Sequence, residues 1–126
     1  MGDRVSISFK NGSEESVTLF SHLGGLDFVE TARDFVRGLV VKKHARGQGS
    51  DARFVLYPQE AMTQLIRHII ETDPDSWEDC YLGKDGDDGD NSDNGHWALD
   101  LDEIAARVNE WVAAIRNSLA DPPKGT

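Results

Sequence analysis

The residues whose types and spacing are best suited to chemistry form one acidic segment, residues 85–95, which lies between two apolar stretches. Five carboxylates occur within nine positions of this segment: Asp85, Asp87, Asp88, Asp90 and Asp93. Like charges this close together repel one another unless a cation, a basic side chain or bulk water screens them. Because clusters of carboxylate and carbonyl oxygens bind Ca²⁺, the acidic segment is first of all a candidate metal site.

One register of the acidic segment matches the first half of an EF-hand calcium loop. With Asp90 as first ligand, Ser92 and Asn94 occupy the third and fifth positions, and Gly95 occupies the sixth, where such a loop turns sharply. The second half does not match, because the twelfth position carries Leu101 in place of a bidentate Glu. The sequence therefore predicts a looser calcium site, with ligands drawn from seven residues: Asp85, Asp87, Asp88, Asp90, Ser92, Asp93 and Asn94.

Two other interpretations fit the same residues. In the first, the acidic segment is a solvated hairpin loop whose Asp and Gly residues serve turn formation and solubility. In the second, it meets basic side chains, either in the same molecule, in a second copy of the chain (self-association) or in a basic partner protein. Within the chain, the basic residues suited to this contact are Lys42, Lys43, Arg46 and Arg53.

A second candidate for chemistry is Ser21-His22, which precedes Gly24 and Gly25 at a predicted strand-to-helix turn. Backbone amides at such a turn can receive an anion, and a hydroxyl or imidazole can reach it. The alternative function is therefore a small hydrolase or transferase that uses Ser21 and His22 with a nearby carboxylate. The surrounding residues match neither a P-loop nor a nucleophile elbow, so we assign no catalytic residue and no cofactor site.

The charge of the chain argues against two classes of partner. The net charge is −10, and residues 73–103 alone carry twelve acids and one base, a net of −11. Nucleic acids and anionic membranes attract clustered Lys and Arg, so we expect neither as a partner. The single cysteine, Cys80, permits no internal disulfide, and no signal-peptide pattern precedes the first predicted strand. We therefore expect a cytoplasmic protein.

The elements that must position these residues follow from apolar periodicity. Apolar and polar residues alternate around a turn-forming Asn-Gly pair, which predicts a first hairpin, and a second hairpin is expected to have the acidic segment as its connection. Three- and four-residue apolar spacing predicts helices, and a stretch with glycines and no apolar period predicts an exposed basic loop. The predicted ranges are strands 5–9 and 16–20, helix 26–40, loop 42–52, a short strand 54–56, helix 58–72, strands 80–82 and 96–101, and a last helix from a cap at Asp102 to residue 119.

These elements predict an α+β fold over residues 1–120. Two β-hairpins form an antiparallel sheet of about four strands, and about three helices pack on one face, in the order β-β-α-α-β-β-α. Asp121-Pro122-Pro123 ends the last helix, and residues 121–126 are expected to be a disordered tail.

Three segments of the chain are also familiar together. They are Met1-Gly2-Asp3-Arg4 before a strand, Leu19-Phe20-Ser21-His22 followed by Gly24-Gly25, and Tyr81-Leu82-Gly83-Lys84 leading to residues 88–96. With these segments, about a third of its length, the chain resembles a family of small uncharacterised microbial and viral proteins. The resemblance implies a similar architecture and a prokaryotic or phage setting, and it transfers no catalytic residue. Leu23 stands where an aromatic residue is expected in that family.

Overall fold

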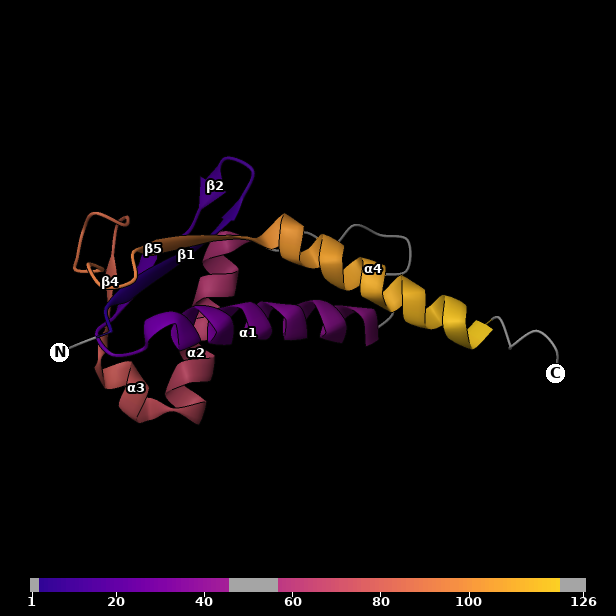
Figure 1. The fold of residues 1–126 in the computed structure, drawn as a ribbon, viewed down its shortest axis with the longest axis horizontal. Helices are drawn as coiled ribbons and strands as arrows, with labels where there is room; N and C mark the ends of the chain where they lie inside the picture. Colours follow the sequence, from indigo (N-terminus) through magenta and orange to yellow (C-terminus); the bar gives the residue numbers. More distant parts are fainter. Residues whose placement is uncertain (1–2, 46–56, 121–126) are drawn as a thin grey trace.

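One sheet with helices on one of its faces contains all the strands that the structure describes (Figure 1). The structure is a computed structural model, and it describes residues 3–45 and 57–120. Its elements are β1 (Val5–Asn11), β2 (Glu14–Glu15), β3 (Thr18–Ser21), α1 (Gly25–Ala45), α2 (Pro58–Thr72), α3 (Pro74–Glu78), β4 (Cys80–Gly83), β5 (His96–Asp100) and α4 (Leu101–Ala120). The predicted α+β class is confirmed. Arg46, Arg53, the strand expected at 54–56 and the tail at 121–126 lie outside the described residues.

The first predicted hairpin is confirmed. β1 pairs antiparallel with β2 next to the turn and with β3 farther along, and Gly12 in the turn has a φ of 63° that favours glycine. β3 in turn pairs antiparallel with β4. Three of the four strand pairings in the described residues are therefore antiparallel, as the sequence predicts.

The second predicted hairpin is wrong. β4 pairs with β3, whereas β5 pairs with β1, in parallel and with Ile7 opposite Trp97. β3 and β1 therefore lie between β4 and β5, and both of these outer strands run in the direction of β1. Parallel strands cannot be joined by a tight turn and need a crossover connection of roughly a dozen residues or more. Residues 84–95 form that connection, which we call the crossover.

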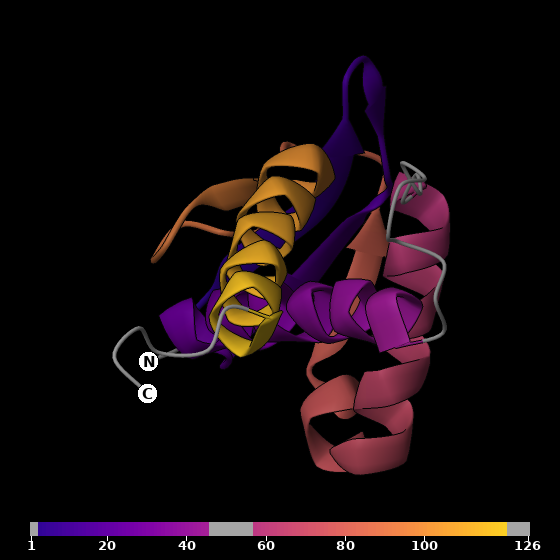
Figure 2. The ribbon, with the colours of Figure 1, turned by 90° about the vertical axis from the view of Figure 1, so that its right-hand side faces the viewer.

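The helices cover the face of the sheet that carries Val5, Ile7 and Phe9. These three side chains are fully buried and pack with apolar residues of α1, α2 and α4. α4 follows β5 directly and projects away from the sheet, so that its C-terminal end faces the viewer in Figure 2. Trp111 and Ile115, on this projecting part, are exposed. In the described ranges, no helix combines the length and apolar character that a membrane crossing requires.

Two predicted helix boundaries need correction. α1 continues to Ala45, so residues 42–45 are helical although we predicted an exposed loop from Lys42 onward. Lys and Ala are good helix formers, and the loss of an apolar period does not by itself end a helix. At the start of α4 the cap is Asp100 and not Asp102, because Asp100 Oδ1 accepts from the backbone N–H groups of Asp102 and Glu103.

On the second face of the sheet, the residues of β1 and β3 are buried, whereas His96 and Ala98 of β5 are exposed. Ser6, Ser8, Thr18 and Phe20 point to this face by strand alternation, and none of them is exposed. An antiparallel sheet commonly leaves one face to solvent. Here the crossover lies over part of this face, with Asn91 donating to the Ser6 hydroxyl.

The buried hydroxyl of Thr18 generates a stability prediction. Among the described residues, Thr18 Oγ1 has no hydrogen-bond partner, whereas the equally buried Ser8 hydroxyl donates to Glu15. Because an unpaired buried hydroxyl is costly, we expect Thr18→Val to raise the free energy of unfolding by roughly 1 kcal/mol, and the control Ser8→Ala to lower it by roughly 1 kcal/mol or more. Urea denaturation measures both changes. A loss of stability in Thr18→Val would contradict the assignment.

Candidate functional site

The crossover, which contains the acidic segment, is fastened to the start of β1 by backbone hydrogen bonds. Asn94 N–H donates to the carbonyl of Arg4 at 2.9 Å, and Ser6 N–H donates to the carbonyl of Gly95 at 3.1 Å. Within the crossover, Gly95 N–H donates to the carbonyl of Asn91 at 2.7 Å. The acidic segment is thus a connection attached to the sheet, and not the loop of a hairpin.

Arg4 is the cation that balances the middle of the acidic segment. Its Nη1 lies 2.5 Å from Asp90 Oδ2, and its Nε and backbone N–H both donate to Asp93 Oδ2, at 3.0 and 2.9 Å. Hydrogen bonds from Arg4 N–H lower the pKa of Asp93, and those from Ser92 lower the pKa of Asp90, each with a further contribution from the guanidinium. Conversely, Asp93 and then Asp90 raise the pKa of Arg4. The expected role of Lys42, Lys43, Arg46 and Arg53 in balancing this charge stays a prediction, because most of these side chains are not described.

The other aspartates of the acidic segment accept backbone hydrogen bonds. Asp85 Oδ1 accepts from Asp87 N–H at 3.0 Å, and Asp88 Oδ2 accepts from Lys84 N–H at 2.7 Å. Short polar side chains commonly stabilise turns in this way. Asp85, Asp87 and Asp88 are exposed, and no basic side chain in the described part of the chain forms an ion pair with them.

Several of the seven predicted calcium ligands already take part in other contacts. Over residues 3–45 and 57–120, no group of three or more His, Cys, Asp or Glu side chains is placed to hold a metal ion. Asp90 and Asp93 share Arg4, Asn94 donates through Nδ2 to the Arg4 carbonyl, and Ser92 is exposed. A cation at this point would have to replace the Arg4 guanidinium. Asp85, Asp87 and Asp88 are the carboxylates that remain open to an external cation.

Gly86 and Gly89 allow the backbone of the crossover to pack closely against aromatic side chains. A Cβ at Gly89 would come within 2.7 Å of Tyr81 and 2.9 Å of Phe20, and one at Gly86 would come within 2.8 Å of the His96 ring. Phe20 and Tyr81 are themselves stacked, with ring centroids 4.9 Å apart, and the Tyr81 hydroxyl accepts from Asp90 N–H at 2.8 Å. These glycines therefore serve close packing and not only turn formation.

Beneath the crossover lies a polar network that the sequence did not predict. His96 Nδ1 is 2.8 Å from Ser6 Oγ, and His96 Nε2 is 3.2 Å from Ser8 Oγ. Ser8 donates to Glu15 Oε2 at 2.5 Å, and Asn91 Nδ2 donates to Ser6 Oγ at 2.9 Å. Hydroxyl, imidazole and carboxylate in series are the groups of a nucleophile and its base. Ser6 and Ser8 are fully buried, whereas His96 and Glu15 are exposed, so the network provides hydrogen-bond partners for the two buried hydroxyls.

Ser21 and His22 lie at the strand-to-helix turn that the sequence predicts. The Ser21 hydroxyl accepts from Gly24 N–H at 3.0 Å and is buried, and the exposed His22 packs its ring against Tyr81. No carboxylate among the described side chains forms a hydrogen bond or ion pair with His22. Beside Ser21, burial raises the pKa of the Cys80 thiol to about 11, which disfavours the thiolate. The Ser21 hydroxyl therefore stabilises the turn before α1 by accepting from Gly24 N–H. The enzymatic alternative stays a prediction.

Comparisons with protein-family models, with curated proteins and with solved structures gave no match. They therefore assign no role to any residue of this chain.

Packing of the crossover on the rings can be tested at Gly89. We expect Gly89→Ala to lower the free energy of unfolding by roughly 1–3 kcal/mol, because its methyl group overlaps Tyr81 and Phe20. The control is Gly38→Ala in α1, where a Cβ meets nothing within 4 Å and helix propensity predicts a gain of up to about 1 kcal/mol. Thermal or urea denaturation measures both. An unchanged stability in Gly89→Ala would show that the crossover does not pack on these rings.

Proposed function

We propose that this chain is a small binding domain that receives a basic segment of a partner protein on the acidic segment. One observation carries the proposal. The crossover is fixed to the sheet by Arg4, by backbone hydrogen bonds and by ring packing, yet Asp85, Asp87 and Asp88 are exposed and unpaired with any basic side chain in the described ranges. Exposed carboxylates that the fold holds in place bind a cationic partner with little loss of conformational entropy.

The charge distribution supports a basic partner over a neutral one. Most of the net charge of −10 lies within residues 73–103, so the field of the molecule is strongest near the crossover. Such a field accelerates the association of an oppositely charged partner and depends on ionic strength. A second copy of the chain is a weaker candidate for this partner, because the copy also carries a net charge of −10.

Calcium is the second ligand that we propose for the same carboxylates. Asp85, Asp87 and Asp88 supply hard oxygen ligands within four residues, which is the chemistry that Ca²⁺ requires. Three carboxylates leave its usual shell of six to eight ligands to be completed by backbone carbonyls and water. The geometry supports calcium less than a basic segment, since the described residues group no three ligands around one point.

The proposal predicts that a hexalysine peptide binds at the acidic segment. In the presence of chelator and at low salt, we expect the peptide to shift the backbone amide resonances of residues 84–95. Asp85→Asn/Asp87→Asn should weaken binding about fivefold, since each exposed ion pair contributes about 0.5 kcal/mol. The matched control is Glu71→Gln/Glu110→Gln, which removes the same charge from exposed positions on α2 and α4 and should leave the affinity within about twofold.

Two results would contradict the proposal. Equal losses in both double variants would show that the peptide senses only the net charge of the protein. Saturable shifts of the same amides with calcium chloride, together with no shift from the peptide, would assign the carboxylates to calcium.

A further inference from the structure

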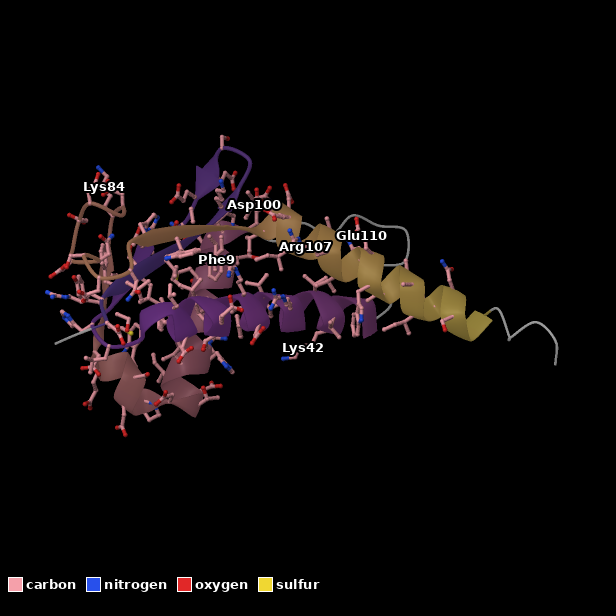
Figure 3. All side chains as sticks on the ribbon, in the orientation of Figure 1. Phe9, Lys42, Lys84, Asp100, Arg107 and Glu110 are labelled. Carbon is pink, nitrogen blue, oxygen red and sulfur yellow. The ribbon has the colours of Figure 1, made fainter. Side chains whose placement is uncertain are left out.

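The second feature of interest is a cavity of about 400 Å³ beside β5, between α1 and α4. Its charged lining residues are Lys10 of β1, Arg33 and Arg37 of α1, Arg107 of α4, and the acids Asp100 and Glu103. Figure 3 shows Arg107 on α4, and Lys84 on the crossover at the other end of the sheet. The cavity is therefore separate from the acidic segment.

The cations of this cavity stand out against the composition of the chain. Four basic residues from three different elements face one cavity, in a chain whose acids outnumber its bases by ten. Cations brought together in this way repel one another unless anionic groups lie between them. The lining residues include only two carboxylates, Asp100 and Glu103, and two more, Glu30 and Asp34, pair with Arg33 and Arg37 from outside the lining.

The acids present do not join the cations across the cavity. Arg33 pairs with Glu30, Arg37 with Asp34 and Arg107 with Glu103, each within its own helix and at a spacing of three or four residues. Such exposed pairs along a helix are weak, at roughly 0.3–0.5 kcal/mol each. Each pair engages one guanidinium nitrogen, so every arginine retains N–H donors for another anion.

The start of α4 does not supply the anion site, because its N-terminus is already capped. Asp100 Oδ1 accepts from the N–H groups of Asp102 and Glu103, at 3.0 and 3.2 Å. An anion in the cavity therefore depends on the side chains of Lys10 and the three arginines. Asp100 and Glu103 then border the cavity with acceptor oxygens, which suit hydroxyl groups of a ligand.

We propose that this cavity binds a small phosphate monoester. A phosphate monoester carries a charge of about −1.5 to −2 at neutral pH, and the N–H donors that the arginines retain, together with Lys10, can bind its oxygens. Planar guanidinium groups bind its oxygens in bidentate fashion. The volume of the cavity falls in the range of small-molecule sites, about 300–1,000 Å³, and leaves room for the organic group beside the phosphate.

Titration with glycerol 3-phosphate, inorganic phosphate and glycerol tests the proposal. With amide resonances as the readout, we expect saturable shifts at Ala98, Asp100 and Arg107 with glycerol 3-phosphate, weaker binding of inorganic phosphate, and none of glycerol. Arg33→Gln/Arg37→Gln should weaken the binding of glycerol 3-phosphate by about tenfold or more, because it removes two charge-assisted contacts. The matched control is Arg67→Gln/Arg116→Gln, which removes two exposed arginines outside the cavity and should have little effect.

Arg33 also lies over the Trp97 ring, at 5.5 Å from its centroid, so its replacement can disturb the fold. Lys10→Gln/Arg107→Gln is therefore a second test, because it removes two cavity cations and leaves that contact in place; it should also weaken binding about tenfold. The absence of saturable shifts at millimolar glycerol 3-phosphate would overturn the proposal. Equal weakening by the control variant would overturn it too, since binding would then reflect only the overall charge.

Discussion

The parallel pairing of β5 with β1 is the constraint on which the rest of the structure depends. β4 and β5 run in the same direction on opposite sides of β3 and β1, so the chain must return across the sheet between them. Helices already cover one face, which leaves the second face for this return. A helix usually makes such a crossover. Here residues 84–95 make it without a helix, and this single fact explains both the burial of Ser6 and the form of the acidic segment.

A crossover without a helix has backbone groups that lack the regular partners of secondary structure. The aspartates of the acidic segment supply partners for several of them. Asp85, Asp88 and Asp90 accept from N–H groups within the crossover, and Asp93 accepts from the N–H of Arg4. The clustered aspartates therefore serve first as hydrogen-bond acceptors for backbone N–H groups. Ion pairs with Arg4 reduce the electrostatic repulsion between Asp90 and Asp93. Proposed binding of a basic segment uses the carboxylates that this arrangement leaves exposed.

Local patterns in the sequence predicted the first hairpin and the long helices, because alternation and three- to four-residue spacing act over neighbouring residues. The second hairpin was wrong because strand pairing joins distant segments, and two strands that flank a loop look the same whether or not they pair. For the same reason, the sequence does not predict the ion pair between Arg4 and Asp90, which are 86 residues apart in the chain. His96 and Asn91 were visible as polar residues, but their partners Ser6 and Ser8 belong to the other end of the sequence.

The sequence does not predict the cavity that is lined by four cations. Lys10, Arg33, Arg37 and Arg107 come from three elements that are far apart in the sequence, so no local window contains all four. Only the packing of α1 and α4 beside β5 brings them together. The molecule therefore carries an acidic crossover at one end of the sheet and, beside β5 toward the other end, a cavity lined by four cations (Figure 3).

The central claim is that Arg4, backbone hydrogen bonds and packing on aromatic rings hold the acidic segment on the sheet. The most direct test is the heteronuclear ¹H–¹⁵N NOE of backbone amides 85–95 in the presence of chelator, since this quantity reports motion on the picosecond to nanosecond timescale. We predict values equal to those of β1 and β3. Values well below those of the strands, which rise to the strand values when calcium is added, would contradict the account.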